Sequence, residues 1–253
     1  MRRKIFLVRH AKSEGNLVIH TCHSEGVDYP ESFRNHVDRE TRVLLPEAES
    51  QINEMATKLL SILDNGVRIL TSDYARTQET IQLAGVAMGR EISFTVDPLL
   101  NERNWGIYEQ LPLSEKNSLR RKKEADPFGV IIPNGESLNQ VKSRFTTLQL
   151  KYAHVPIVLA FTHQEFIIAA ICEWLDITTE QFKQMNLYVD TPNCCIVEMC
   201  ENVIGVRNVK IHSDGVAKVI APSSHDPNSY QHYENMAEIF RSELAQILAK
   251  KVA

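Results

Sequence analysis

The sequence lacks any apolar run near the roughly 20 residues that a helix needs to cross a bilayer. Its first residues, Met1-Arg2-Arg3-Lys4, are followed by only a short apolar stretch that ends at Arg9. A secretory signal needs a distinct apolar segment with a cleavage site, so we expect neither a signal peptide nor a membrane partner. The absence of both indicates a globular protein that folds in water.

Cysteine is also scarce, and its five copies are odd in number with no C-x-x-C pair. Disulfide frameworks and structural zinc sites use paired cysteines, so we predict reduced thiols in a cytoplasmic protein. His20, Cys22 and His23 lie close together, but no fourth ligand follows at a suitable spacing, and we expect no metal site. The remaining cysteines are Cys172, Cys194, Cys195 and Cys200.

Neither sign of charge is in large excess, because 28 basic and 32 acidic residues leave a net charge of -4. No global field draws such a protein to nucleic acid or to an anionic membrane surface. We therefore expect no nucleic-acid partner, and any anion site must be local. The 253 residues, 43% of them apolar, suffice for a large buried core.

Strand-length apolar segments alternate with longer helical patterns, which is typical of an α/β protein with a mostly parallel sheet. We predict a three-layer α/β/α sandwich that forms one domain over residues 1–253. Residues 22–42 show no period and are predicted to form a surface loop. Strands are expected at 4–8, 67–71, 92–96, 156–161, 195–199 and 203–211, and helices at 46–63, 74–88, 164–175, 179–186 and 230–250.

The segment at about 98–155 breaks this alternation. It contains Asp126-Pro127, Gly129 and Asn134-Gly135, which interrupt regular structure. We interpret it as a helical lid inserted after the third strand, apart from the core layers. A central strand buried on both faces, 156–161, is expected directly after it.

Histidines follow two of the predicted strands, His10 after the first and His163 after the fourth. Arg76 lies in the first turn of the helix that follows another strand, and Ser72 or Asp73 is expected to cap that helix. The carboxyl ends of parallel strands meet at one edge of a sheet, where open α/β folds bind ligands. An imidazole beside guanidinium groups supplies a nucleophile and donors for phosphate oxygens.

The run from Arg9 to Asn16, R-H-A-K-S-E-G-N, resembles the R-H-G-x-S-x-x-N signature of the histidine phosphatase superfamily, also called phosphoglycerate mutase-like. Residues 45–48 resemble its L-T-x-x-G segment, residues 72–80 its S-x-x-x-R-x-x-x-T segment, and Thr162-His163 its second histidine. The resemblance covers most of the chain.

The resemblance implies that His10 is a nucleophile that becomes phosphohistidine. It implies that Arg9, Arg76 and His163 hold the phosphoryl oxygens, with further phosphate contacts from Ser13 and Asn16. Positive charge around the equatorial oxygens is what phosphoryl transfer requires, and arginines supply it without a cofactor.

Residues 100–106, L-N-E-R-N-W-G, resemble the acid-bearing segment of the mutases and broad phosphatases of this superfamily. Glu102 is therefore the expected general acid, which later serves as the base that activates water. Gly135-Glu136-Ser137 resembles a turn of the same branch, in which Ser137 is at least as suited to a helix cap as Glu136 is to a pocket contact. The basic run from Arg120 to Lys123 is either a solvated helix face or a contact for a second anionic group.

The chain departs from the family pattern at Ala11, which replaces a glycine, and at Ala48-Glu49, which also lacks one. A metal-independent phosphatase acting on a small phosphomonoester is favoured. A cofactor-dependent phosphoglycerate mutase is the alternative, although Gly15 stands where those mutases have tryptophan and the stretch from Glu102 to Gly135 is short. A non-catalytic phospholigand-binding protein remains a third reading. A protein phosphohistidine phosphatase is disfavoured by the lid, and a homodimer is left open.

Overall fold

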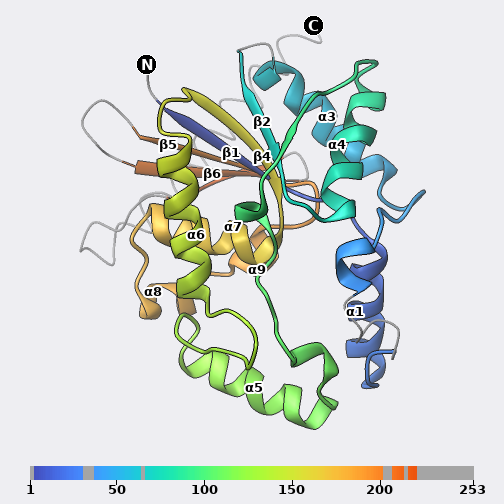
Figure 1. Ribbon diagram of the computed structural model, residues 1–253, viewed down its shortest axis with the longest axis vertical. Coiled ribbons are helices and arrows are strands. Elements are labelled where there is room, and N and C mark those ends of the chain that lie inside the picture. Colours follow the sequence, from blue (N-terminus) through green and yellow to red (C-terminus); the bar gives the residue numbers. More distant parts are fainter. Residues whose placement is uncertain (1–2, 31–36, 64–65, 202–206, 214–215, 221–253) are drawn as a thin grey trace, which may run out of the picture.

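A computed structural model describes residues 3–30, 37–63, 66–201, 207–213 and 216–220. They contain one mixed sheet of seven strands in the order β3-β2-β4-β1-β5-β6-β7 (Figure 1). β1, β2, β3 and β4 pair in parallel, whereas β5, β6 and β7 each pair antiparallel with the preceding neighbour, so five of the seven strands run in one direction. The strands are β1 (Lys4–Arg9), β2 (Arg68–Thr71), β3 (Thr95–Val96), β4 (Ile157–Thr162), β5 (Ile196–Glu201), β6 (Arg207–Ser213) and β7 (Val216–Ile220).

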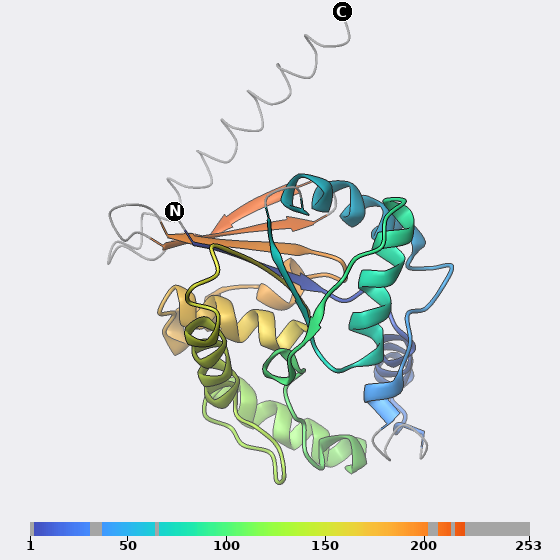
Figure 2. The same cartoon turned by 45° about the horizontal axis from the view of Figure 1, so that its top comes forward.

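Helices cover both faces of this sheet (Figures 1 and 2). The described helices are α1 (Glu14–Glu25), α3 (Glu49–Leu63), α4 (Ala75–Ala87), α5 (Leu113–Ala125), α6 (Leu138–Lys151), α7 (Gln164–Trp174), α8 (Thr179–Gln184) and α9 (Leu187–Asp190), with short 3₁₀ turns at Val37–Glu40, Pro98–Leu100 and Tyr108–Gln110. Side chains along β1 alternate between the faces, as the two-residue period of a strand requires. Ile5 and Leu7 pack with α6 and α7, whereas Phe6 and Val8 pack with α3 and α4. The predicted α/β/α layering is confirmed.

Several predicted boundaries differ from the structure in the first half of the chain. The first helix continues through Cys22 to Glu25, because Cys22 is buried against Tyr29, so the loop expected from Cys22 begins later. The helix expected from Pro46 begins at Glu49, since residues 45–48 form a turn. The strand expected over 92–96 is reduced to Thr95–Val96.

The C-terminal part holds one strand that the sequence reading missed. β7 pairs with β6, which itself spans Arg207–Ser213 rather than 203–211. The helix expected over 230–250 lies outside the described residues. All five cysteines are free thiols, and Cys195 is buried. In the described part of the chain, no helix has both the length and the apolar character to cross a bilayer.

The segment predicted as an inserted lid divides into two parts. α6 packs on α7, and its Leu138, Val141 and Phe145 are fully buried in the main core, where each such side chain contributes about 1.5–3 kcal/mol. The interpretation of 98–155 as lying apart from the core layers is therefore wrong for α6. The error arose because the exposed face of α6 is polar and because residues that interrupt regular structure precede it. α5 extends beyond the carboxyl edge of the sheet (Figure 1).

Candidate active site

Strand register brings the candidate residues together. Arg9 at the end of β1 pairs with Thr162 at the end of β4, so His10 and His163 leave the sheet side by side. Their ring centroids lie 5.2 Å apart. β2 pairs with the other side of β4, and Thr71 lies opposite Phe161. The helix that carries Arg76 therefore begins beside the two histidines, as the sequence predicts.

His10 is buried, and its Nδ1 lies 2.7 Å from the carbonyl oxygen of Ala11. A carbonyl only accepts hydrogen bonds, so Nδ1 carries the proton and Nε2 keeps a lone pair. Burial lowers the pKa of His10 well below its ordinary value, and the charges of Arg76 and Arg9 lower it further. The imidazole is thus neutral at pH 7, with Nε2 as its nucleophilic atom.

Arg76 connects the two histidines from the first turn of α4. Its Nε donates to Nε2 of His10 at 3.1 Å, and its Nη2 donates to Nδ1 of His163 at 3.1 Å. Its Nη1 donates to the hydroxyl of Thr41 at 3.2 Å, and its guanidinium stacks on the Tyr74 ring. The guanidinium plane is thereby fixed beside the nucleophilic nitrogen.

His163 is fully buried behind Arg76 and does not line the cavity described below. Because Nδ1 accepts from Arg76, its proton lies on Nε2, which donates to Ser72 Oγ at 2.8 Å. Burial, followed by the charge of Arg76, lowers the pKa of His163 well below its ordinary value. The prediction that Ser72 or Asp73 caps α4 is therefore wrong. Tyr74 is the N-cap residue, without a side-chain hydrogen bond.

Arg9 supplies a second guanidinium to the site. Its Nη1 donates to the carbonyl of Thr191 at 2.8 Å, whereas its buried Nε has no hydrogen-bond partner among the described residues. An unpartnered buried donor is costly, and a phosphate oxygen would satisfy it. Burial lowers the pKa of Arg9, while Glu102 is among the groups that raise it.

Asn16 and Ser13 lie at the start of α1, which begins beside His10. Ser13 is the N-cap residue, and its hydroxyl accepts from the Asn16 amide. Asn16 Oδ1 accepts from Ser13 and, at 3.1 Å, from Asn193 Nδ2. The carbonyl end of the Asn16 side chain is thus occupied, which leaves its NH₂ group for an anion.

Asn193 was not predicted from the sequence. Its Nδ2 also donates to the carbonyl oxygen of His10 at 2.8 Å, so one amide group holds both His10 and Asn16. It lies 183 residues from His10, in a turn that follows helix α9 rather than at the end of a strand. The short Thr191-Pro192-Asn193 sequence was the signal available, because asparagine after proline is typical of a turn that contacts backbone groups.

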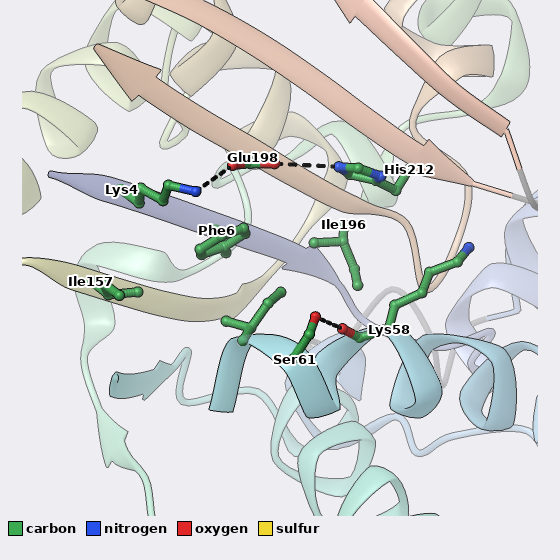
Figure 3. Close-up of a pocket in the computed structure, with 9 residues that line it drawn as sticks. Lys4, Phe6, Lys58, Ser61, Ile157, Ile196, Glu198 and His212 are labelled. Carbon is green, nitrogen blue, oxygen red and sulfur yellow. Dashed lines mark hydrogen bonds and ion pairs between the residues drawn. The ribbon is translucent and has the colours of Figure 1, made fainter. Parts of the chain in front are cut away.

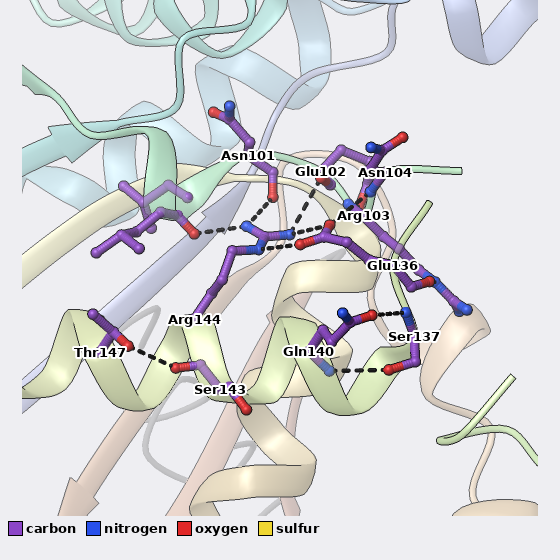
Figure 4. A network of polar contacts seen from close by, with 12 residues as sticks. Asn101, Glu102, Arg103, Asn104, Glu136, Ser137, Gln140, Ser143, Arg144 and Thr147 are labelled. Atoms are coloured by element: carbon purple, nitrogen blue, oxygen red, sulfur yellow. Dashed lines mark hydrogen bonds and ion pairs between the residues drawn. The ribbon is translucent and has the colours of Figure 1, made fainter. Parts of the chain in front are cut away.

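Glu102 follows the 3₁₀ turn after β3, and Arg144 of α6 anchors this segment (Figure 4). Arg144 donates to the backbone carbonyls of Leu99, Asn101 and Glu102. Glu136 pairs with the same guanidinium at 3.0 Å and does not line the cavity that His10 lines. Ser137 caps α6 in a reciprocal pair with Gln140, as its sequence position suggested.

A cavity of about 500 Å³ contains six of the seven predicted site residues, namely Arg9, His10, Ser13, Asn16, Arg76 and Glu102. Gly15 also lines it. Arg120 and Lys123 reach the same cavity from α5, whereas Arg121 and Lys122 do not. The basic run of α5 is therefore one solvated face and one cavity-lining face.

One part of the cavity wall is a cluster of polar side chains that was not predicted from the sequence, namely Arg103, Lys123, Glu165 and Tyr188. Glu165, in the first turn of α7, accepts from Lys123 Nζ at 2.8 Å, from the Tyr188 hydroxyl at 2.7 Å and from Arg103 at 3.4 Å. Burial alone would raise the pKa of Glu165, but Lys123 and Arg103 outweigh it and lower that pKa. Its position two residues after His163 was the only indication in the sequence.

Backbone hydrogen bonds join residues 104–107 to residues 133–136, the two segments on either side of the stretch that carries α5. The Glu136 amide donates to the carbonyl of Asn104 at 2.8 Å, and the Ile107 amide donates to the carbonyl of Pro133 at 3.1 Å. Gly106 has a φ of +54°, and a Cβ there would lie 2.1 Å from the Pro133 oxygen. Only glycine fits so close an approach.

A second cavity of about 550 Å³ lies between α3 and the sheet, away from these residues (Figure 3). Glu198 lies on its wall between Lys4 at 3.0 Å and His212 at 3.6 Å, and these partners lower the pKa of Glu198 to about 2. Its floor is apolar, with Phe6, Ile157 and Ile196. Throughout the described ranges, no three His, Cys, Asp or Glu side chains gather as a metal site requires.

Residues 5–210 match the model of the histidine phosphatase superfamily (branch 1). A probable phosphoglycerate mutase, GpmB, from Yersinia enterocolitica is 27% identical over 146 residues, which span 56% of this chain and 59% of that protein.

Two solved structures show the same fold. A mycobacterial glucosyl-3-phosphoglycerate phosphatase has a TM-score of 0.58 at 16% identity, covering 88% of this chain and 100% of its own. A phosphoserine phosphatase from Entamoeba histolytica has a TM-score of 0.56 at 19% identity, covering 78% and 90%.

Proposed function

Because the chain belongs to the histidine phosphatase superfamily, branch 1, we propose that it is a metal-independent phosphatase of small phosphomonoesters that works through a phosphohistidine on His10. The observation that carries the proposal is the neutral His10, whose Nε2 lone pair faces Arg76 and opens to a cavity. A neutral imidazole beside fixed guanidinium groups is a nucleophile with its anion site already built.

In the first half-reaction, Nε2 of His10 attacks phosphorus and the bond to the leaving oxygen breaks. Arg9, Arg76 and the NH₂ group of Asn16 bind the phosphoryl oxygens, so Arg76 Nε exchanges its contact with His10 for one with phosphate. Glu102 donates a proton to the departing alkoxide. Its place on the cavity wall supports this role.

In the second half-reaction, the Glu102 carboxylate takes a proton from water, and the resulting oxygen attacks phosphorus while the bond to Nε2 breaks. Phosphate leaves, and His10 returns to its neutral form. His163 acts in this proposal through Arg76, since its Nδ1 orients Nη2 and its own proton is held by Ser72.

A phosphoglycerate mutase is the second candidate, supported by the name of the Yersinia relative. That reaction would return the phosphoryl group from His10 to a second hydroxyl of the bound acid. Gly15, which resembles the phosphatases at this position, lines the cavity and favours hydrolysis. Incubation with 3-phosphoglycerate and 2,3-bisphosphoglycerate separates the two, because a mutase yields 2-phosphoglycerate and a phosphatase yields phosphate.

The test of the proposal is hydrolysis of p-nitrophenyl phosphate in the presence of a chelator. We expect phosphate release that His10→Ala removes and that His20→Ala, an exposed position on α1, leaves intact. A base-stable, acid-labile phosphoryl label should form on the wild-type chain and on His20→Ala but not on His10→Ala. Equal turnover in His10→Ala, with a native circular-dichroism spectrum, would refute the mechanism, and no turnover in any variant would favour a binding protein.

A further inference from the structure

The cavity that holds His10 has a second, chemically different region. Beyond the phosphate-binding residues its wall is apolar and aromatic, contributed by Ile19, Tyr29, Tyr108, Leu119, Val130 and Ile132. These side chains come from α1, the segment after it, α5 and the segments that flank α5, and all of them line the cavity that holds His10. A cavity of about 500 Å³ lies within the range of roughly 300–1,000 Å³ that is typical of sites for whole organic ligands.

Most cations of this outer region are engaged by the protein itself. Lys123 Nζ bonds Glu165 and lies within 5 Å of the Trp105 and Tyr188 rings, at 4.7 and 4.8 Å. Arg103 donates to the carbonyls of Glu136 and Val130 and to Glu165. A second anionic group on a substrate would compete with Glu165 for these charges, so this part of the wall would bind such a group only weakly.

Lys116 contacts aromatic rings instead, because its buried Nζ lies 3.5 Å from the centre of the Tyr29 ring and 5.9 Å from that of Tyr108. Arg120 differs, since its side chain is 66% exposed at the outer end and has Glu124 at 3.8 Å. A charge exposed to this degree attracts anions only weakly. What the wall presents to a leaving group is therefore mainly apolar surface.

From this wall we infer that the preferred substrates are phosphomonoesters whose alcohol carries a bulky apolar or aromatic group, rather than short polar phosphoacids. The inference rests on the proposed phosphatase function, because it assumes that the phosphoryl group lies against His10. Each buried methylene-sized group favours binding about fourfold. A phenyl group seated on this wall should therefore outweigh the polar contacts that a short hydroxy acid could make.

The test uses phosphonates, which bind without reacting. We expect 2-phenylethylphosphonate to bind at least about tenfold more tightly than ethylphosphonate by calorimetry, since the two share one anionic head. Leu119→Gln, at a half-buried cavity position on α5, should reduce this ratio severalfold. Leu150→Gln is the matched control, because Leu150 is 74% exposed on α6 and does not line the cavity.

Equal affinities, or a ratio that Leu150→Gln lowers as much as Leu119→Gln, would overturn the inference. The phosphonate measurement stands apart from turnover. A chain that prefers the phenyl compound but hydrolyses no ester refutes the phosphatase and keeps the apolar subsite. A chain that hydrolyses ethyl phosphate and phenylethyl phosphate equally, with equal phosphonate affinities, keeps the phosphatase and loses the substrate class.

Discussion

Arg76 donates one hydrogen bond to each histidine of the site, at 3.1 Å to Nε2 of His10 and at 3.1 Å to Nδ1 of His163. Both imidazoles accept from a permanent cation, so neither can hold a second proton without breaking that contact. The electrostatics of the site therefore keep both rings neutral, and the folded state itself opposes their protonation.

The first prediction concerns stability and pH. Both histidines have pKa values well below the ordinary value when folded, so at acidic pH the unfolded chain binds more protons and the free energy of unfolding falls as pH falls below about 6.5. Between about pH 7.5 and pH 5.5 the two groups should together remove about 3 kcal/mol, measured by urea unfolding. His163→Gln should lose about half of this pH dependence.

The control for that measurement is Asp97→Asn, because, despite its burial, Lys151 and the Leu99 amide hold the pKa of Asp97 below its ordinary value, and its contribution is therefore lost only at much lower pH. Its variant should keep the wild-type slope between pH 7.5 and 5.5. A wild-type unfolding free energy that stays constant across this window would contradict the lowered histidine pKa values.

The second prediction concerns the proton donor. Glu102→Gln should reduce kcat/KM for ethyl phosphate by about 10²–10³-fold but change kcat/KM for p-nitrophenyl phosphate far less, because kcat/KM reports the first half-reaction and a nitrophenolate leaves without protonation. Glu180→Gln, at an exposed position of α8, should alter neither. Equal losses on the two esters would exclude Glu102 as the acid.

The third prediction concerns Asn193, a positioning residue that holds the His10 carbonyl and Asn16. Asn193→Ala should lower kcat/KM by about 10–100-fold, because a small displacement of the nucleophile is costly. Most of the effect should fall on kcat, whereas a purely structural role would lower the melting temperature and leave the kinetics of the folded fraction unchanged. Asn139→Ala, exposed on α6, is the control.

The fourth prediction concerns the buried pair of Lys123 and Glu165. Glu165→Leu leaves two cations without their carboxylate and should destabilise the protein by about 3–5 kcal/mol. Lys123→Met should raise the pKa of Glu165, since the lysine is the main charge that lowers it. The double variant should be less destabilised than the sum of the two, and strict additivity would show that the pair does not interact.

The sequence predicts which strand ends form the candidate site well, because strand ends are local features. His10, His163 and Arg76 each follow a strand, and parallel pairing then brings them together without further information. The partners of these residues are harder to predict. Ser72 is equally suited to a helix cap, and only the neighbouring strand, which brings His163 to its hydroxyl, decides between the two roles.

Misassigned elements have a similar cause. The buried stripe of α6 is defined by α7, which follows it in the chain, and its exposed face is polar enough to suggest a surface helix. Glu165 and Asn193 act through contacts 42 and 183 residues away, respectively. Tertiary contacts of this length leave no periodic trace in the sequence.

The hydrogen bonds between residues 104–107 and 133–136 have a consequence for how new activities arise in such a protein. They join the two ends of the intervening stretch to each other, and in the sequence this stretch lies after Glu102 and before α6. Substitutions within residues 108–132 can therefore change Tyr108, Leu119 and Val130 on the cavity wall without altering the strand ends that carry His10. Under the proposed function, variation in this stretch would change which alcohol is released and leave the proposed phosphoryl-transfer site unchanged.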